Sequence, residues 1–411
     1  MSKETEQILQ NPAPPADALD APFPSKRMHV NLGPSHPAMH GTVRAVVELD
    51  GENIDSMKLD IGFLHRGFEK SCENVTWTQV FPYTDRLNYV SSIMNNVGYS
   101  LAVEKLCRLE VPERAKYLRV LTSELHRMSD HLTLVGAMGL ELGAMTVLIY
   151  CMEARDILWD RLTEIAGARL TSNYARIGGV ARDMPDGWQD KVERTLVRVA
   201  GLRDEVDKLL TRNRIVMDRL VATGRISRAD AIDYGFTGPC LRATGEPYDI
   251  RKASPYLVYD RLDFDVPVGS NGDNFDRYLM RLEELKQSER IVRQCFEQIP
   301  PGDIVVEDYR YVMPPKPQVY GTIEGAMAHF KIVMEGIQVP AGEAYSCTEA
   351  ANGELGFYLV SDGGGRPYKI GVRAPGWNML MALPAMLQGE LLADLIPTFD
   401  TINMIGGEVE Q

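Results

Sequence analysis

The sequence predicts an α+β protein with a central long-helix bundle and small N-terminal and C-terminal β-sheet regions. Its 411 residues are 45% hydrophobic and 25% charged, which is the ordinary usage of a packed globular chain. Apolar stripes with helical spacing fill the middle of the chain. Short strand-like runs, separated by turn signals, lie near both ends.

Residues 1–27 are expected to form a proline-rich extended arm. Prolines at positions 12, 14, 15, 22 and 24 favour polyproline-like backbone over a packed element. Strand-like runs follow at 28–32, 43–49 and 57–61, and Gly-Pro and Asp-Gly turn signals separate them. They predict a small sheet within a first region, 28–97.

Residues 98–300 are predicted to form the helical bundle. Pro112 stands at the start of a helix whose apolar face has spacings of 3 and 4, namely Leu118, Leu121, Leu125, Met128, Leu132 and Val135. A second stripe consists of Val192, Leu196, Val199, Leu202, Val206 and Leu209. Further helices are expected through the 140s to 160s and over 274–297, so at least four long helices pack together.

The apolar window 134–152 contains one carboxylate, Glu141. A membrane span is disfavoured because the window lacks an aromatic belt and flanking basic clusters. Glu141 is therefore expected to be buried, with a histidine or arginine beside it. Glycines at positions 136, 139 and 143 leave room for another element to approach this helix closely.

Residues 301–411 are predicted to form a C-terminal sheet and tail. Runs at 357–361 and 368–373 flank Asp-Gly-Gly-Gly and predict a β-hairpin. The hairpin is expected to belong to the same domain as the bundle, residues 28–411, and no internal repeat is found.

Composition and motifs exclude several function classes. The chain has 44 basic and 57 acidic residues, a net charge of −13, which disfavours nucleic acid as a partner. Its six cysteines form no Cys-x-x-Cys pair, so neither a zinc site nor a disulfide framework is indicated. No secretory signal is recognisable at the N-terminus. No dinucleotide fingerprint or phosphate loop is present, and the chain is not expected to bind NADH itself.

Two short regions contain candidate functional side chains. His36 and His40 are four residues apart, but Pro37 makes the run a loop, which disfavours a helical zinc pair and leaves an ordinary turn role open. Tyr83, Arg86 and Tyr89 form a donor-rich run suited to carbonyl oxygens, although aromatic packing is an equal alternative.

A third group lies on the helix that follows Pro112. Glu124, Arg127 and His131 share one face of it and predict a solvated or intramolecular ion-pair stripe.

Seven motifs, in order, resemble one known family. They are GPSHPAMHG (33–41), GFLHRGFEK (62–70), YTDRLNY (83–89), SNYARIGGV (172–180), LRATGEPYDIRK (241–252), FDVPVG (264–269) and ELGFYLVSDGG (354–364). The family is the D-type, or 49 kDa-type, subunit of the proton-pumping NADH:quinone oxidoreductases, respiratory complex I. The resemblance spans about 28–408 and implies a fold like the large subunit of nickel-iron hydrogenases. The two Cys-x-x-Cys motifs of those hydrogenases are missing here.

The resemblance implies a quinone-site subunit of the peripheral arm. With the adjacent iron-sulfur subunit, the B-type subunit, it would form the chamber where electrons from NADH reduce quinone, coupled to proton translocation. Quinone is the implied substrate, and the [4Fe-4S] cluster would be held by the partner, because these cysteines offer no ligand set. Other implied partners are the C-type subunit, further peripheral-arm subunits and membrane-arm subunits at the junction. The implied location is the cytoplasmic face of the bacterial inner membrane, as a peripheral subunit without a transmembrane helix.

The resemblance also implies roles for seven residues. His40 and Tyr89 correspond to the two side chains that hold the quinone head group, and Glu141 stands where the family's acid is usually aspartate. Residues placed on the cofactor side are His36, Arg66, Arg86 and Thr171, where Thr171 replaces a frequent histidine. The chain ends in Glu-Gln rather than in an acid followed by arginine. The alternative is a non-catalytic scaffold subunit of a related membrane-bound redox complex.

Overall fold

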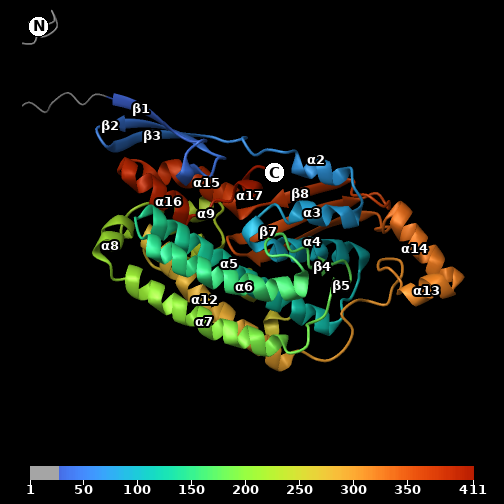
Figure 1. Cartoon of the computed structure of the whole chain (residues 1–411). Coiled ribbons are helices and arrows are strands. Elements are labelled where there is room, and N and C mark those ends of the chain that lie inside the picture. Colours follow the sequence, from blue (N-terminus) through green and yellow to red (C-terminus); the bar gives the residue numbers. More distant parts are fainter. Residues whose placement is uncertain (1–26) are drawn as a thin grey trace, which may run out of the picture.

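The computed structural model describes residues 27–411, so the predicted arm lies outside the described residues except for Arg27. The first three strands, β1 Arg27–Leu32, β2 Arg44–Asp50 and β3 Asn53–Asp60, form one antiparallel sheet in that order. Alternate residues of β2 are buried. They pack onto α15 Pro375–Leu387 and α16 Leu395–Thr401 from the other end of the chain (Figure 1). The predicted N-terminal sheet is confirmed.

The predicted bundle is also present. Its long helices are α5 Glu113–Glu141, α6 Met145–Ala166, α7 Trp188–Leu210 and α12 Asn274–Gln298 (Figure 1). Every residue of the predicted α5 stripe is buried. In α7 the last member of the stripe is Leu210 rather than Leu209, which is 42% exposed, because the last spacing from Val206 is i to i+4 rather than i to i+3.

The apolar window 134–152 is two helices rather than one. Gly143 has a φ of +86°, and the chain turns there between α5 and α6. A Cβ on Gly136 would lie 3.0 Å from Cys151 Cβ, and one on Gly139 would lie 2.9 Å from Val147 Cγ1. These glycines therefore let α6 fold back closely onto α5, as predicted. Within residues 27–411, no helix is long and apolar enough to cross a membrane.

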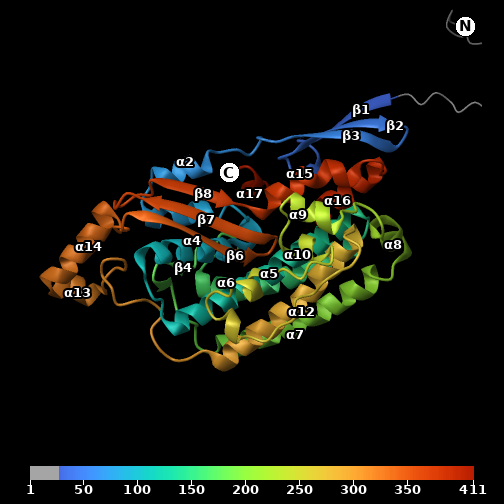
Figure 2. The same ribbon diagram turned by 180° about the vertical axis from the view of Figure 1, so that it is seen from behind.

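The C-terminal sheet has three antiparallel strands, β6 Gly342–Ala350, β7 Gly353–Ser361 and β8 Lys369–Arg373, and α4 Ser92–Cys107 packs against it (Figure 2). The predicted hairpin is β7 and β8. The sequence did not indicate β6, because the first half of this strand is mostly exposed and lacks a clean apolar alternation.

Short elements complete the described chain. They are α2 Phe68–Glu73, α3 Phe81–Thr84, β4 Ala175–Arg176, β5 Gly179–Val180, α8 Arg214–Leu220, α9 Arg228–Asp233, α10 Gly238–Arg242, α11 Ile250–Ala253, α13 Lys316–Gly321, α14 Ile323–Glu335 and α17 Gly406–Val409. Short 3-10 helices include η2 Pro37–Met39 and η4 Tyr89–Ser91. Helices α13 and α14 project from one end of the molecule (Figures 1 and 2).

Candidate functional site

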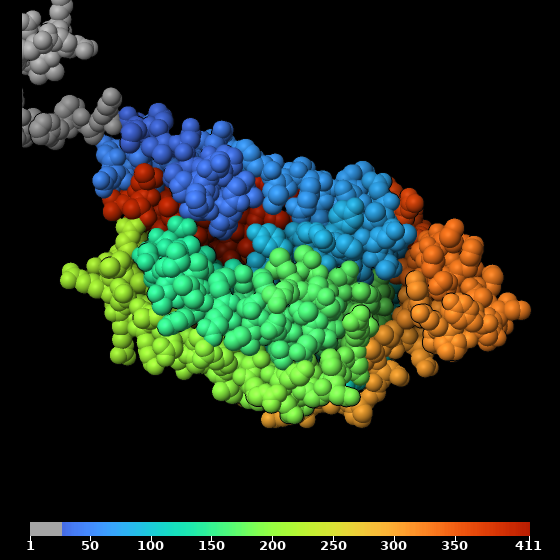
Figure 3. Space-filling model, viewed as in Figure 1, coloured from blue at the N-terminus to red at the C-terminus, as the bar shows by residue number. Residues whose placement is uncertain are grey.

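The buried C-terminal segment, residues 399–410, organises the candidate site. In Figure 3 it reaches the visible face only between the N-terminal region and the helical bundle. A Cβ on Gly406 would lie 2.7 Å from Thr42 Cγ2, and one on Gly407 would lie 2.2 Å from the carbonyl oxygen of Arg86. Only residues without a side chain fit between these two loops. The segment therefore brings the loop of His40 and the loop of Tyr89 to the same place.

Arg66 ties a third loop to the same segment. Its guanidinium donates to the carbonyl oxygens of Arg86, at 3.0 Å, and Gly407, at 3.1 Å. Desolvation lowers the pKa of Arg66, although an arginine stays charged at neutral pH. The N–H of Leu64 donates to the Glu410 carboxylate. The site thus contains Arg66 and the Arg86 backbone together, while the Arg86 side chain is half exposed.

His40 lies at the end of η2 in the left-handed region, with a φ of 53°. Such backbone is uncommon outside glycine and is concentrated at functional sites. The ring stands edge-on to Phe399 at 5.4 Å between centroids. Desolvation lowers the pKa of His40, opposed by the backbone at Met404 and the charge of Glu141. His36 has a turn role, because its Nδ1 accepts the N–H of Ala38 at 3.2 Å.

Tyr89 begins η4 and is 37% exposed. Its position is set by Asp130 of α5, which accepts hydrogen bonds from residues on both sides of the tyrosine, Asn88 at 2.9 Å and Ser91 at 2.8 Å. Burial raises the pKa of Tyr89, and the charges of Asp130 and Glu408 raise it further. The side chain is therefore a neutral phenol at physiological pH, able to donate a proton.

Behind Tyr89, buried polar residues connect Asp130 to the C-terminal segment. Asn403 donates to Asp130 at 2.8 Å and to Asn352, and Asn352 donates to Glu408 Oε1 at 3.0 Å. Burial raises the pKa of Glu408 to about 8. Sequence reasoning missed all four residues. The only local signal was a carboxylate at position 130, between two members of the apolar α5 stripe.

The expectation that Glu141 is buried beside a histidine or arginine is wrong. Glu141 is the last residue of α5 and is exposed, because the turn at Gly143 ends the helix there. Its charge still acts on the site: it opposes the lowering of the His40 pKa. It also adds to the effect of burial that raises the pKa of Asp400 to about 8.

Thr171 lies in the loop after α6, next to the helix that follows Tyr89. Ser92 Oγ donates to the carbonyl of Leu170 at 2.6 Å and accepts the N–H of Ser172 at 3.1 Å. Thr171 stands between these two residues and is partly buried. The structure therefore brings the Thr171 loop to the start of α4, three residues from Tyr89.

The α5 face with Glu124, Arg127 and His131 is fully buried, so the solvated alternative is wrong and the ion-pair alternative is confirmed. His131 Nε2 lies 2.7 Å from Glu284 of α12. Arg127 donates to the carbonyls of Glu349 and Ala350. This pairing holds the end of β6, and with it the turn that contains Asn352.

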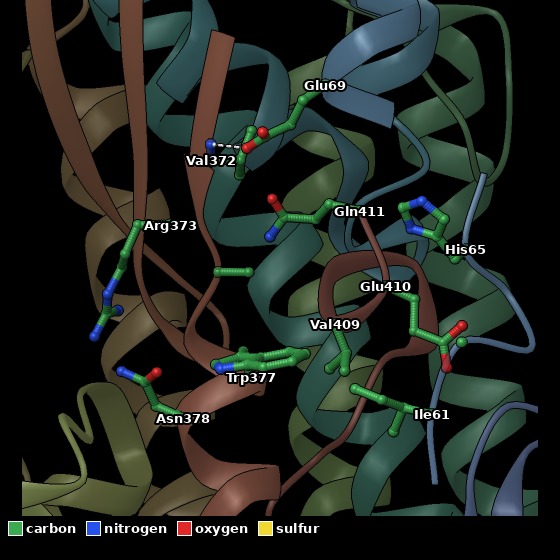
Figure 4. A pocket seen from close by; sticks show the side chains of 12 residues that line it. Ile61, His65, Glu69, Val372, Arg373, Trp377, Asn378, Val409, Glu410 and Gln411 are labelled. Carbon is green, nitrogen blue, oxygen red and sulfur yellow. Dashed lines mark hydrogen bonds between the residues drawn. The ribbon is translucent and has the colours of Figure 1, made fainter. Parts of the chain in front are cut away.

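A cavity of about 560 Å³ lies beside the site rather than at His40 or Tyr89. Figure 4 shows His65 and Glu410 on one side of it and Trp377 and Asn378 on the other. The end of the C-terminal segment forms part of its wall, at Val409, Glu410 and Gln411. The segment that contains Asn403 and Glu408 therefore also forms part of the cavity wall.

Gly407→Ala is expected to destabilise the chain by about 1–3 kcal/mol, the usual cost of overpacking. The new Cβ would lie 2.2 Å and 2.6 Å from the carbonyl oxygens of Arg86 and Leu87, and backbone cannot move aside cheaply. Urea unfolding of the purified chain measures the effect. The matched control is Gly201→Ala in α7, where a Cβ meets nothing within 4 Å and helix propensity favours alanine. Equal stability of the two variants would contradict this account of the segment.

The fold and the site define a class of protein: an α+β chain in which a buried C-terminal segment meets three loops, those of His40, Tyr89 and Arg66. In the described part of the chain, no group of three or more His, Cys, Asp and Glu side chains is placed to hold a metal ion. Residues 141–411 match the family described as respiratory-chain NADH dehydrogenase, 49 Kd subunit.

Similar proteins point to the same family. An NADH-quinone oxidoreductase D-type subunit from Anaeromyxobacter dehalogenans is 77% identical over 393 residues, 96% of this chain and 91% of that protein. The D-type subunit from Myxococcus xanthus is 63% identical over 406 residues, which cover 97% of this chain and 98% of that protein. The C/D-type subunit from Bdellovibrio bacteriovorus is 46% identical over 400 residues, which cover 97% of this chain and 71% of that protein. The chain belongs to the 49-kDa, or D-type, subunit family of NADH-quinone oxidoreductase, and the resemblance of its motifs to that family is confirmed.

Proposed function

We propose that this chain is the quinone-site subunit of the peripheral arm of complex I, with quinone bound between His40 and Tyr89. The observation that carries the proposal is the burial of the C-terminal segment between the loops of these two residues. Both side chains remain partly open to solvent, so a ligand can reach them.

The chemistry of these residues supports the proposal. Two-electron reduction of a quinone places negative charge on two carbonyl oxygens, which then take up two protons. Tyr89 is a neutral phenol and can donate one proton. His40 can donate the second when it is protonated; desolvation lowers its pKa, and the backbone at Met404 and the charge of Glu141 partly oppose this. Glu141 therefore acts on His40 through its charge.

The electron donor would be a [4Fe-4S] cluster held by the iron-sulfur partner, the B-type subunit. The cysteines of this chain are at positions 72, 107, 151, 240, 295 and 347, and burial raises the pKa of most of their thiols, which disfavours thiolate ligands. Arg66, Arg86, Thr171 and His36 would lie on the side that faces the cluster. The first two bring positive charge, which stabilises a reduced cluster.

Partners follow from the family. The C/D-type relative joins two subunit designations in one protein, which supports the C-type subunit as a neighbour of this chain. Other peripheral-arm subunits would supply electrons from NADH. Membrane-arm subunits at the junction would couple quinone reduction to proton translocation, with this chain as a peripheral membrane subunit.

The test replaces His40 by glutamine in the assembled complex. Quinone-dependent NADH oxidation is expected to fall by about 10²-fold, while NADH oxidation with ferricyanide stays at the wild-type rate, because that acceptor takes electrons before the quinone site. The matched control is His29→Gln on β1, whose side chain is 72% exposed. A wild-type quinone rate in His40→Gln would favour the alternative, a scaffold subunit without quinone chemistry.

A further inference from the structure

Glu408 is a buried acid that the proposed chemistry does not use. Only 1% of it is exposed. Its Oε1 accepts a hydrogen bond from Asn352, and a Cβ on Gly376 would lie 2.6 Å from the same oxygen. The position is therefore shaped for a side chain of this size, with a single side-chain donor among the described residues.

Asp130 has a different environment, although it is equally buried. Three side-chain donors face its two oxygens, from Asn88, Ser91 and Asn403. Three donors suit a carboxylate, which accepts hydrogen bonds only. The one side-chain donor of Glu408, Asn352, contacts Oε1, and among the described residues no hydrogen bond reaches Oε2, which is therefore available to carry a proton. Asn403 and Asn352 connect the two acids by hydrogen bonds. The charges of both acids raise the pKa of Tyr89.

The charged and titratable groups that face Glu408 come from three elements. They are Asp130 of α5, Tyr89 of η4 and Arg373 at the end of β8. Burial and, to a lesser extent, the charge of Asp130 raise the pKa of Glu408 to about 8, while the hydrogen bond from Asn352, the Gly376 backbone and Arg373 oppose this. The guanidinium of Arg373 is occupied by the carbonyls of Glu354 and Gly235.

We infer that Glu408 is a positioning residue that carries a proton behind Tyr89, and that Tyr89 donates its proton to reduced quinone only while Glu408 is neutral. This inference rests on the proposed function. In the donation step the phenolic O–H bond breaks and an O–H bond forms on the quinone oxygen. The negative charge moves from that oxygen to the phenolate. An ionised Glu408 would add a second buried negative charge next to the phenolate and would prevent the step.

The test is the pH profile of quinone-dependent NADH oxidation by the assembled complex. In the wild type, ionisation of Glu408 is expected to lower the rate by about tenfold between pH 7 and pH 9, in addition to the fall caused by the loss of the His40 proton. In Glu408→Gln the residue stays neutral, and its amide oxygen can still accept from Asn352. Its rate at pH 7 is expected within about twofold of the wild type, and it should fall by about tenfold less than the wild-type rate between pH 7 and pH 9, because only the loss of the His40 proton then remains.

The matched control is Asp400→Asn, since burial also raises the pKa of Asp400 to about 8 but its charged neighbour is Glu141 rather than Tyr89. This variant should keep the wild-type fall above pH 8. An equal loss of rate at every pH in Glu408→Gln would show a purely structural role and overturn the inference. A fall between pH 7 and pH 9 that is as steep in Glu408→Gln as in the wild type would also overturn it.

Infrared spectra of the complex provide a readout that does not depend on turnover. The carbonyl absorption of protonated carboxylic acids should decrease between pH 7 and pH 9 in the wild type, and by less in Glu408→Gln. An equal decrease in both would overturn the inference. A different result would contradict the proposed function itself: wild-type rates of quinone-dependent NADH oxidation in both Tyr89→Phe and His40→Gln.

Discussion

Tyr89→Phe is expected to lower quinone-dependent NADH oxidation by about 10²-fold or more, the usual contribution of one acid-base group. The aromatic ring and its packing are kept, and only the phenolic proton is lost. The neighbouring hydrogen bonds from Asn88 and Ser91 to Asp130 do not involve the Tyr89 hydroxyl, so η4 should keep its position. The complex should therefore assemble normally, as judged by its size in native gels and its ferricyanide-linked NADH oxidation.

The matched control is Tyr234→Phe, another partly exposed tyrosine, which lies at the end of α9. This variant should have the wild-type rate in both assays. If Tyr89→Phe also has the wild-type quinone rate, Tyr89 only packs at this position and the proton comes from elsewhere.

The fold could be predicted largely from local pattern. The α5 stripe and the three N-terminal strands were recognisable because their apolar residues repeat with the period of the element. β6 was missed because burial of its second half depends on α4, which is far away in the sequence. Register and pairing of this kind leave no local pattern.

The candidate site could be predicted only in part. The motifs that resemble the family pointed to His40 and Tyr89, and their loops are brought together by the C-terminal segment. The residues behind Tyr89 depend on contacts between distant positions, since Asn403 and Asp130 are 273 residues apart in the sequence. A single sequence contains no sign of such a pairing. Gly406 and Gly407 were visible as a pair of glycines, but not the loops that require them.

Glu141 was predicted to be buried, and this prediction is wrong. Hydropathy alone joined two helices into one apolar window and placed the carboxylate in its middle. The turn at Gly143 has a positive φ, which glycine adopts readily, and it places Glu141 at a helix end. The small size of this glycine predicts close packing, but its backbone freedom is what ends the helix and exposes Glu141.

Arg242→Met is expected to destabilise the chain by about 3–5 kcal/mol, the cost of leaving buried charges without a partner. Arg242 is fully buried and donates to Glu284, to Glu349 at 2.8 Å and to the carbonyl of Tyr248 at 2.9 Å. Methionine has a similar length but no donor. Urea unfolding of the purified chain at pH 7 measures the loss. The matched control is Arg290→Met, which breaks exposed pairs with Asp263 and Asp265 and should cost less than about 1 kcal/mol.

The effect of Arg242→Met should also depend on pH. Burial alone would raise the pKa of Glu284, but the charge of Arg242 and the hydrogen bond from His131 lower it well below its ordinary value of 4.5. A lowered pKa in the folded state stabilises the fold above the unfolded pKa, and this stabilisation is lost as pH falls through the folded value. The difference between wild type and Arg242→Met should therefore be largest near pH 7 and shrink below pH 4.5. A difference that stays constant down to pH 3 would show that Arg242 stabilises the core by packing rather than by its charge.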